Sequence, residues 1–212
     1  MITIRYDPDG VFLERGGISR AELAQLDARL AAARDDVLAD ARLWAEGGEV
    51  PPEKRPLDAG FHELPERLLL ERRETGVMGE VSQIKAAADR LANRVDTVLV
   101  LGIGGSYMGA RAMLEACCHV YHNEVEPVMR RGRPRMYFEG NNVDNDALLD
   151  LVRLLESRGD RWGIVVISKS GGTLETAAAF RILLRELRGT PGHDAGNIGE
   201  LVVPVTGKSG KL

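Results

Sequence analysis

Hydrophobic and polar positions change their spacing near residue 95, and this change divides the chain into two parts. Before it, leucines and valines recur every three or four positions, as they do on one face of a helix. After it, runs of consecutive apolar residues, typical of strands buried on both faces, alternate with segments of helical spacing. We therefore expect a helical section over residues 1–95 and an α/β domain over residues 96–212.

The clearest helix of the front section covers residues 17–48. Ser19 is followed three positions later by Glu22, the pattern of a capping box, and Gly47 and Gly48 are placed to end the helix. Its apolar residues are largely compatible with one face. Two further helices are expected over residues 63–76 and 78–94.

The hydrophobic pattern of residues 96–212 predicts four strands with three helices between them. The strands are expected in "DTVLVLGIGGS" (96–106), "PRMYFEGNN" (134–142), "WGIVVISKSGG" (162–172) and "ELVVPVTGKSG" (200–210), and the helices over 109–122, 144–159 and 173–189. Strands alternating with helices of this length form right-handed βαβ units, so we expect a parallel sheet with helices on both faces.

Three consecutive strands end in loops with the composition of a binding site. The loops are "GIGGS", "EGNNVDN" and "SKSGGT". In such a sheet ligands bind beyond the carboxyl ends of the strands, where these loops should meet.

The stretch "SKSGGTLET" (168–176) has the composition of an anion site. Its serines and threonines offer four hydroxyl donors, its two glycines let backbone N–H groups approach an anion, and the following helix adds its positive end. The simpler interpretation is a capped helix after a turn, but one cap accounts for only one hydroxyl. We favour a single phosphate group held by neutral donors.

A dinucleotide site is the competing interpretation of "LGIGGSYMG". Gly102 and Gly104 fit the fingerprint Gly-x-Gly-x-x-Gly, but Tyr107 occupies the third glycine position. Glu139 ends the second strand, where a ribose-binding acid would lie. The match is partial, and we assign Glu139 no role.

Composition narrows the function classes. The formal net charge of −4 gives no bulk attraction to nucleic acid or to an anionic membrane surface. The two cysteines are adjacent and the four histidines scattered, so neither a disulfide framework nor a metal site is expected. The start resembles no signal peptide, and no apolar stretch approaches the length of a membrane span, so a cytoplasmic location is expected.

The segments "GIGGSYMGARA", "FEGNNVD" and "VVISKSGGTLETAAAFR", in this order, resemble the phosphoglucose isomerase family, in particular the first of its two sugar-isomerase (SIS) domains. The resemblance implies a flavodoxin-like three-layer sandwich that takes part in interconverting glucose 6-phosphate and fructose 6-phosphate in glycolysis and gluconeogenesis. No cofactor is implied, and the full-length family forms homodimers.

The resemblance also implies roles for particular residues. Those that would hold the sugar phosphate are Ser168, Lys169, Ser170, Gly171, Gly172, Thr173 and Thr176, and those that would line the sugar are Gly105 and Ser106. Glu175 matches an acid that supports the site. Gly172 departs from the threonine most common in the family, which removes one hydroxyl from the pattern.

The resemblance assigns no catalytic residue within residues 1–212. The reaction needs a base that moves a proton between C1 and C2 and groups that open the ring. In the family these are a glutamate, a histidine and a lysine from later in the chain, and nothing here matches their motifs. We therefore expect an amino-terminal portion, without the second SIS domain, that binds the sugar phosphate and does not turn it over.

Two alternatives remain open. A stand-alone SIS module that senses a sugar phosphate predicts a complete pocket, whereas a portion of an isomerase predicts an exposed apolar sheet edge and helix face. A nucleotide-dependent oxidoreductase predicts NAD binding.

Overall fold

The computed structural model describes residues 5, 7–13, 15–55, 57, 59–191 and 195–207, which fall into two compact units, residues 1–79 and 80–212. The helices and strands are α1 (Arg20–Glu46), α2 (Leu64–Thr75), α3 (Glu80–Ala92), β1 (Thr97–Leu101), α4 (Gly105–Cys117), β2 (Arg135–Glu139), α5 (Asn145–Arg158), β3 (Trp162–Ser168), α6 (Leu174–Gly189) and β4 (Val202–Thr206). Short 3-10 helices cover Asp9–Val11, Pro52–Lys54, Ala59–His62, Gly76–Met78 and Ala195–Glu200. Helix α3 belongs to the same compact unit as the sheet, because this unit begins at Glu80. The boundary at residue 95 between a helical section and an α/β domain stays a prediction from the sequence.

Helix α1 begins as the sequence predicts. The Ser19 hydroxyl accepts a hydrogen bond from the Glu22 N–H, the Glu22 carboxylate accepts one from the Ser19 N–H, and Gly47 ends the helix in the left-handed conformation. The predicted apolar face is not buried, since none of the residues of α1 is buried and Leu30 and Val37 are more than half exposed. The capping signal is local, whereas the burial of a face depends on what packs against it.

The α/β unit contains one four-stranded sheet in the order β2-β1-β3-β4, and every pair of neighbouring strands is parallel. This is the order of the first strands of flavodoxin-like folds. The predicted fold class is therefore confirmed, and all four predicted strands are present. Residues 208–210 of the fourth predicted strand lie outside the described residues.

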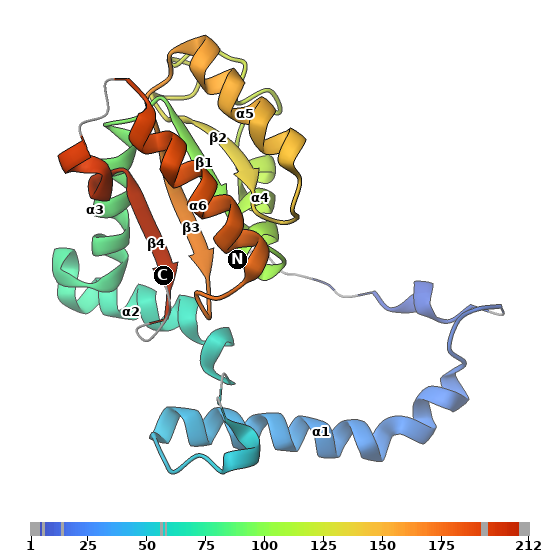
Figure 1. Ribbon diagram of the computed structural model, residues 1–212. Coiled ribbons are helices and arrows are strands. Elements are labelled where there is room, and N and C mark those ends of the chain that lie inside the picture. Colours follow the sequence, from blue (N-terminus) through green and yellow to red (C-terminus); the bar gives the residue numbers. More distant parts are fainter. Residues whose placement is uncertain are drawn as a thin grey trace. The chain divides into compact units, whose positions relative to one another are not determined.

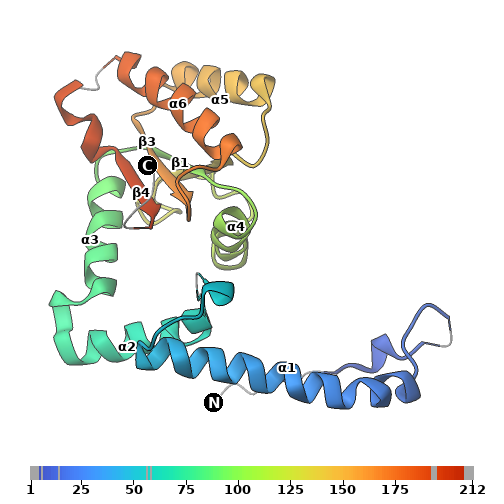
Figure 2. The same ribbon diagram turned by 60° about the horizontal axis from the view of Figure 1, so that its bottom comes forward.

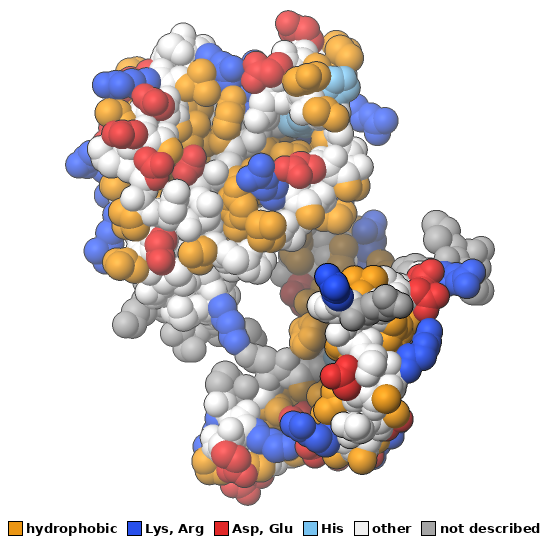
Figure 3. All heavy atoms as spheres, turned by 90° about the vertical axis from the view of Figure 1, so that its right-hand side faces the viewer, with side chains coloured by type: hydrophobic (Ala, Val, Ile, Leu, Met, Phe, Trp, Pro, Cys, Tyr) orange, Lys and Arg blue, Asp and Glu red, His pale blue; other side chains and the backbone are white. Residues whose placement is uncertain are grey.

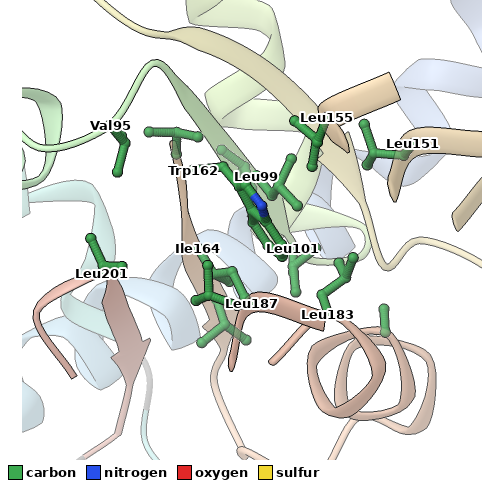
Figure 4. Close-up of a cluster of buried hydrophobic side chains, with 14 of the residues drawn as sticks. Val95, Leu99, Leu101, Leu151, Leu155, Trp162, Ile164, Leu183, Leu187 and Leu201 are labelled. Carbon is green, nitrogen blue, oxygen red and sulfur yellow. The ribbon is translucent and has the colours of Figure 1, made fainter. Parts of the chain in front are cut away.

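Helices cover both faces of this sheet (Figures 1 and 2). On one face, leucines of α5 and α6 pack against alternate residues of β1 and β3, and Figure 4 shows this cluster. Its members include Leu99, Leu101, Leu151, Leu155, Ile164, Leu183 and Leu187, most of them less than 3% exposed. On the other face, a Cβ atom at Gly163 would lie 2.8 Å from Leu91 of α3, so β3 needs a residue without a side chain there.

Helix α4 differs from its prediction at both ends. It begins at Gly105 rather than at residue 109, and it ends at Cys117 rather than at residue 122. Cys118 has an extended backbone, and the His119 ring accepts a hydrogen bond from the Tyr121 N–H, so a local turn replaces the last expected helical turn. The adjacent cysteines therefore do not both lie on the helix.

Apolar side chains also lie at the surface of the α/β unit (Figure 3). Val205 on the edge strand β4 is 49% exposed, and Leu174 at the start of α6 is 73% exposed. Within the described residues, none of the helices is both long enough and apolar enough to span a membrane.

Candidate functional site

The loops that follow β1, β2 and β3 meet at the carboxyl edge of the sheet. Leu101 at the end of β1 pairs with Glu139 of β2 and with Val166 of β3. The Gly102 N–H then donates to the Glu139 carbonyl over 3.0 Å, which ties the first loop to the second. The convergence expected from the βα rhythm is therefore present.

The loop between β3 and α6 is a tight turn rich in hydroxyl groups. Ser168 is 3% exposed, and the Gly171 N–H donates to its carbonyl over 3.3 Å. Gly171 adopts a φ of 63°, which favours glycine, and the Gly172 N–H donates to the Ser170 hydroxyl over 3.2 Å. The Ser168 and Thr173 hydroxyl oxygens lie 3.2 Å apart in a hydrogen bond that either can donate. The structure thus brings together Ser168, Ser170 and Thr173 from the predicted set.

Thr173 is the N-cap residue of α6, yet its side chain makes no capping hydrogen bond with the described residues. The simpler interpretation of this threonine as an ordinary helix cap is therefore not what the structure shows. Its hydroxyl points to Ser168, and the amino end of the helix keeps its positive partial charge available for an anion.

Thr176 lies one turn into α6 and joins two loops. It is 1% exposed, and its hydroxyl donates to the Gly140 carbonyl over 3.3 Å. Gly140 has a φ of 80°, and a Cβ atom there would lie 3.3 Å from the Gly102 nitrogen. Because a hydroxyl has one proton, Thr176 holds the loop after β2 in place in this structure rather than presenting a donor to a ligand.

The first loop approaches α4 closely. A Cβ atom on Gly102 would lie 2.5 Å from the Ser106 carbonyl oxygen, and Gly104 adopts a φ of 55°. Only glycine fits the first of these positions. Gly105 is exposed and Ser106 half-buried in the first turn of α4, so a second helix amino end lies at the same edge of the sheet.

Charged residues of both signs lie at this edge of the sheet. Lys169 directly follows Ser168 and is exposed, and Glu175 is half-buried in the first turn of α6. Burial raises the pKa of the Glu139 carboxyl, and the nearby Asp144 carboxylate raises this pKa further.

Tyr107, the residue that breaks the dinucleotide fingerprint, is 7% exposed. Its ring packs edge-on against Phe138 with 5.6 Å between the centroids, and its hydroxyl accepts a hydrogen bond from Arg111. The fingerprint requires a glycine here so that helix and strand pack closely, and a buried aromatic ring fills that space.

Sequence reasoning missed Thr206, the last residue of β4. It is the register partner of Ser168 on the neighbouring strand. Its hydroxyl oxygen is the one buried side-chain nitrogen or oxygen atom of the described residues that finds no hydrogen-bond partner. An unsatisfied buried hydroxyl costs about 1–3 kcal/mol. A signal was present, because the last residues of parallel strands meet at one edge, but the register was needed to place it beside Ser168.

No histidine belongs to the three loops that follow β1, β2 and β3. His122 bonds through Nε2 to the Pro134 carbonyl, and His119 accepts a hydrogen bond from the Tyr121 N–H. His62 belongs to the unit of residues 1–79, and His193 lies outside the described residues. A cavity of about 720 Å³ lies between α3, α4 and the sheet, and one of about 410 Å³ lies at the amino edge between α5 and α6. In the described parts of the chain, no group of three or more His, Cys, Asp or Glu residues is placed to hold a metal ion.

Comparison with known proteins points to one enzyme family. The chain is 43% identical over 115 residues to the glucose-6-phosphate isomerase of Acetivibrio thermocellus, covering 54% of this chain and 25% of that protein. It is 42% identical over 124 residues to the glucose-6-phosphate isomerase of Symbiobacterium thermophilum, covering 58% and 25%. The chain thus spans about a quarter of the length of these relatives, and the resemblance predicted from the sequence is confirmed. No family model matches the chain.

A solved structure supports the fold. The crystal structure of a hypothetical protein from Thermus thermophilus aligns with 88% of this chain and 40% of its own, with a TM-score of 0.51 and 22% sequence identity.

Proposed function

We propose that this chain binds the phosphate group of glucose 6-phosphate or fructose 6-phosphate, as the phosphate-holding part of a glucose-6-phosphate isomerase. The observation that carries the proposal is the Ser168–Thr173 hydroxyl pair at the amino end of α6, where Thr173 makes no capping hydrogen bond. It is supported by the identity of 42–43% to such isomerases over 54–58% of the chain. A helix amino end with hydroxyl and backbone donors is suited to a phosphate group.

The predicted residues take different parts in this grip. The Ser168, Ser170 and Thr173 hydroxyls would donate to the phosphate oxygens, together with backbone N–H groups of Gly171 and Gly172. Lys169 would add positive charge. Thr176 would hold the loop after β2 through the Gly140 carbonyl, and Glu175 would support the first turn of α6.

Gly105 and Ser106 would line the sugar. They begin α4, which follows β1, and β1 is the strand next to β3. A ligand held by its phosphate at the start of α6 could therefore extend its carbon chain toward them. Isomerisation moves a proton between C1 and C2 through an enediolate, so fixing the phosphate would fix the distance of these carbons from the base. We assign the base and the ring-opening groups to no residue of this chain, and we propose no cofactor.

A binding module without catalysis is the second candidate. It is favoured by the cradle itself, since every group in it comes from one loop and the helix that follows, so the phosphate grip needs no second chain. A dinucleotide site is disfavoured by the buried Tyr107 ring.

Calorimetric titration of the chain with fructose 6-phosphate tests the proposal. The Ser168→Ala, Thr173→Ala double variant removes two hydrogen bonds to a charged group and should cost roughly 3 kcal/mol, or about a hundredfold in Kd. The control is Ser157→Ala, Thr190→Ala, because these hydroxyls donate to backbone carbonyls near the far ends of α5 and α6. Equal affinity of parent and double variant would refute the phosphate assignment.

A coupled assay for glucose 6-phosphate separates the two candidates. Binding without turnover by this chain, with turnover restored by the remaining length of a matched isomerase, supports the isomerase part. If the chain binds the sugar phosphate with the same affinity whether or not the remaining length of the isomerase is added, and the mixture shows no turnover, the binding module is supported.

A further inference from the structure

We propose that Thr206 is a positioning residue of the phosphate site, which orients Ser168 when a phosphate is bound. The inference rests on the proposed function, and it starts from the buried Thr206 hydroxyl, which has no hydrogen-bond partner among the described residues. Buried polar groups in folded proteins are nearly always hydrogen-bonded, so an exception at a candidate site calls for a functional reason.

The strand register places Thr206 next to Ser168. The two residues are Cα partners across the parallel pair β3 and β4, so their side chains lie on the same face of the sheet. Neighbouring strands are about 4.8 Å apart, and a hydroxyl oxygen extends from each Cβ atom. A change of side-chain rotamer therefore suffices to bring the two oxygens into hydrogen-bond distance, without movement of the backbone.

The backbone after Thr206 is also close to the loop that follows Ser168. A Cβ atom on Gly207 would lie 3.3 Å from the Lys169 carbonyl oxygen. A side chain at position 207 would therefore press on the backbone of this loop, which shows how close the ends of β3 and β4 lie.

In this structure the Ser168 hydroxyl is hydrogen-bonded to Thr173 rather than to Thr206. In that pair one hydroxyl donates and the other accepts, over 3.2 Å. When both donate to a phosphate, neither proton is available to the other, and the Ser168 oxygen keeps lone pairs that can accept. Thr206 then donates to Ser168, which donates to the phosphate. This arrangement satisfies the buried hydroxyl and needs no contact between Thr206 and the ligand.

The proposal predicts opposite changes in stability and affinity for Thr206→Val, which removes the hydroxyl and keeps the shape. Without ligand, the variant should melt about 2–4 °C higher than the parent, because an unsatisfied hydroxyl is gone. Its Kd for fructose 6-phosphate should rise about 3- to 10-fold, since the hydrogen bond that orients Ser168 is lost. Thr206→Ser retains a hydroxyl and should restore the parent affinity.

The experiment combines thermal unfolding and calorimetry of the parent, Thr206→Val, Thr206→Ser and Ser168→Ala, each with fructose 6-phosphate and with inorganic phosphate. A valine variant that loses stability and affinity together would show a structural role and overturn the proposal. If the parent binds, Ser168→Ala binds weakly and Thr206→Val binds like the parent, the inference fails and the proposed function stands. If the parent binds neither compound, both fail.

Discussion

The two edges of the sheet hold polar groups in different ways. At the amino edge, charged side chains are paired across strands: Asp96 accepts two hydrogen bonds from the Arg161 guanidinium, each over 3.1 Å, and Asp160 accepts one from the buried Thr97 over 2.7 Å. At the carboxyl edge, Ser168 and Thr173 share one hydrogen bond, and the Thr206 hydroxyl finds no partner among the described residues. Groups that satisfy one another stabilise the fold, whereas neutral donors with unused protons are suited to a ligand.

The strongest test of this contrast changes the amino edge at Asp160. The Asp160 side chain is 9% exposed and also pairs with Arg135 over 3.4 Å. Asp160→Ala therefore leaves the largely buried Arg135 guanidinium without its carboxylate partner and the Thr97 hydroxyl without its acceptor. We expect the free energy of unfolding to fall by about 3 kcal/mol, with the fructose 6-phosphate affinity of the folded protein unchanged. Urea unfolding followed by circular dichroism measures the first and calorimetry the second.

Asp150→Ala is the matched control. Asp150 pairs with Arg153 at the surface of α5, where both side chains are more than 60% exposed, and its loss should change stability by no more than about 0.5 kcal/mol. A loss at Asp160 no larger than that of the control would show that the amino edge does not clamp the strands.

The next effect is expected at the carboxyl edge, with Thr173→Val. The substitution removes one hydroxyl and keeps the branched shape, so we expect a tenfold weaker Kd for fructose 6-phosphate, or about 1.4 kcal/mol. Stability should change by less than about 1 kcal/mol. Calorimetry and thermal unfolding check both, with Thr190→Val as control, and an unchanged Kd would contradict the role of Thr173.

A smaller effect is expected at Asp96, and it depends on pH. The hydrogen bond from Arg161 is the main cause that lowers the pKa of Asp96. The ionised Asp96 therefore contributes its stability above the ordinary pKa of a carboxyl, near 4. This contribution is lost as the pH falls through the lowered pKa of Asp96 in the folded protein. Because the Asp96 side chain is 42% exposed, solvent screens the pair, and Asp96→Asn should cost only about 0.5 kcal/mol at pH 7.

Unfolding of the parent and Asp96→Asn between pH 2 and 7 measures this difference. The two curves should converge at the acid end. A difference that stays constant with pH would mean that the charge of Asp96 is not what stabilises the start of β1 and β3.

The smallest effect is expected at Glu139 and has the opposite sign. Burial raises its pKa, so the folded state favours the protonated carboxyl, and the stability due to this preference is lost as the pH rises through the raised value. Glu139→Gln should therefore raise the melting temperature at pH 7 by about 1 °C and leave it unchanged near pH 3.5. A lower melting temperature at pH 7 would show that the ionised carboxylate has a favourable partner.

The sequence was sufficient for the order of the elements and for the local signals. The apolar runs predicted all four strands, and the Ser19–Glu22 pattern predicted the capping box, because both depend on residues close in the chain. The loops at the carboxyl edge followed from the βα rhythm, which brings the ends of consecutive strands together. The stretch 168–176 could therefore be chosen as a site without knowledge of the sheet order.

Features that depend on register could not be predicted. Asp96 and Arg161 are 65 positions apart, and Thr206 adjoins Ser168 only because β4 pairs with β3 in one alignment. The resemblance places the Thr176 hydroxyl among the phosphate donors, and its hydrogen bond to the Gly140 carbonyl is visible only once the loop after β2 is placed. The last helical turn expected of α4 is absent, and the Tyr121 N–H is bonded to the His119 ring instead. The spacing of apolar residues does not reveal this local hydrogen bond.

The most direct test of the contrast is a titration with fructose 6-phosphate followed by the backbone amide resonances of the protein. We predict saturable shifts for Gly171, Gly172 and Thr173 at the carboxyl edge, with smaller shifts for Gly105 and Ser106, and no shift for Asp96 or Arg161. Shifts concentrated at the amino edge, or none at residues 168–176 at saturating ligand, would contradict the account.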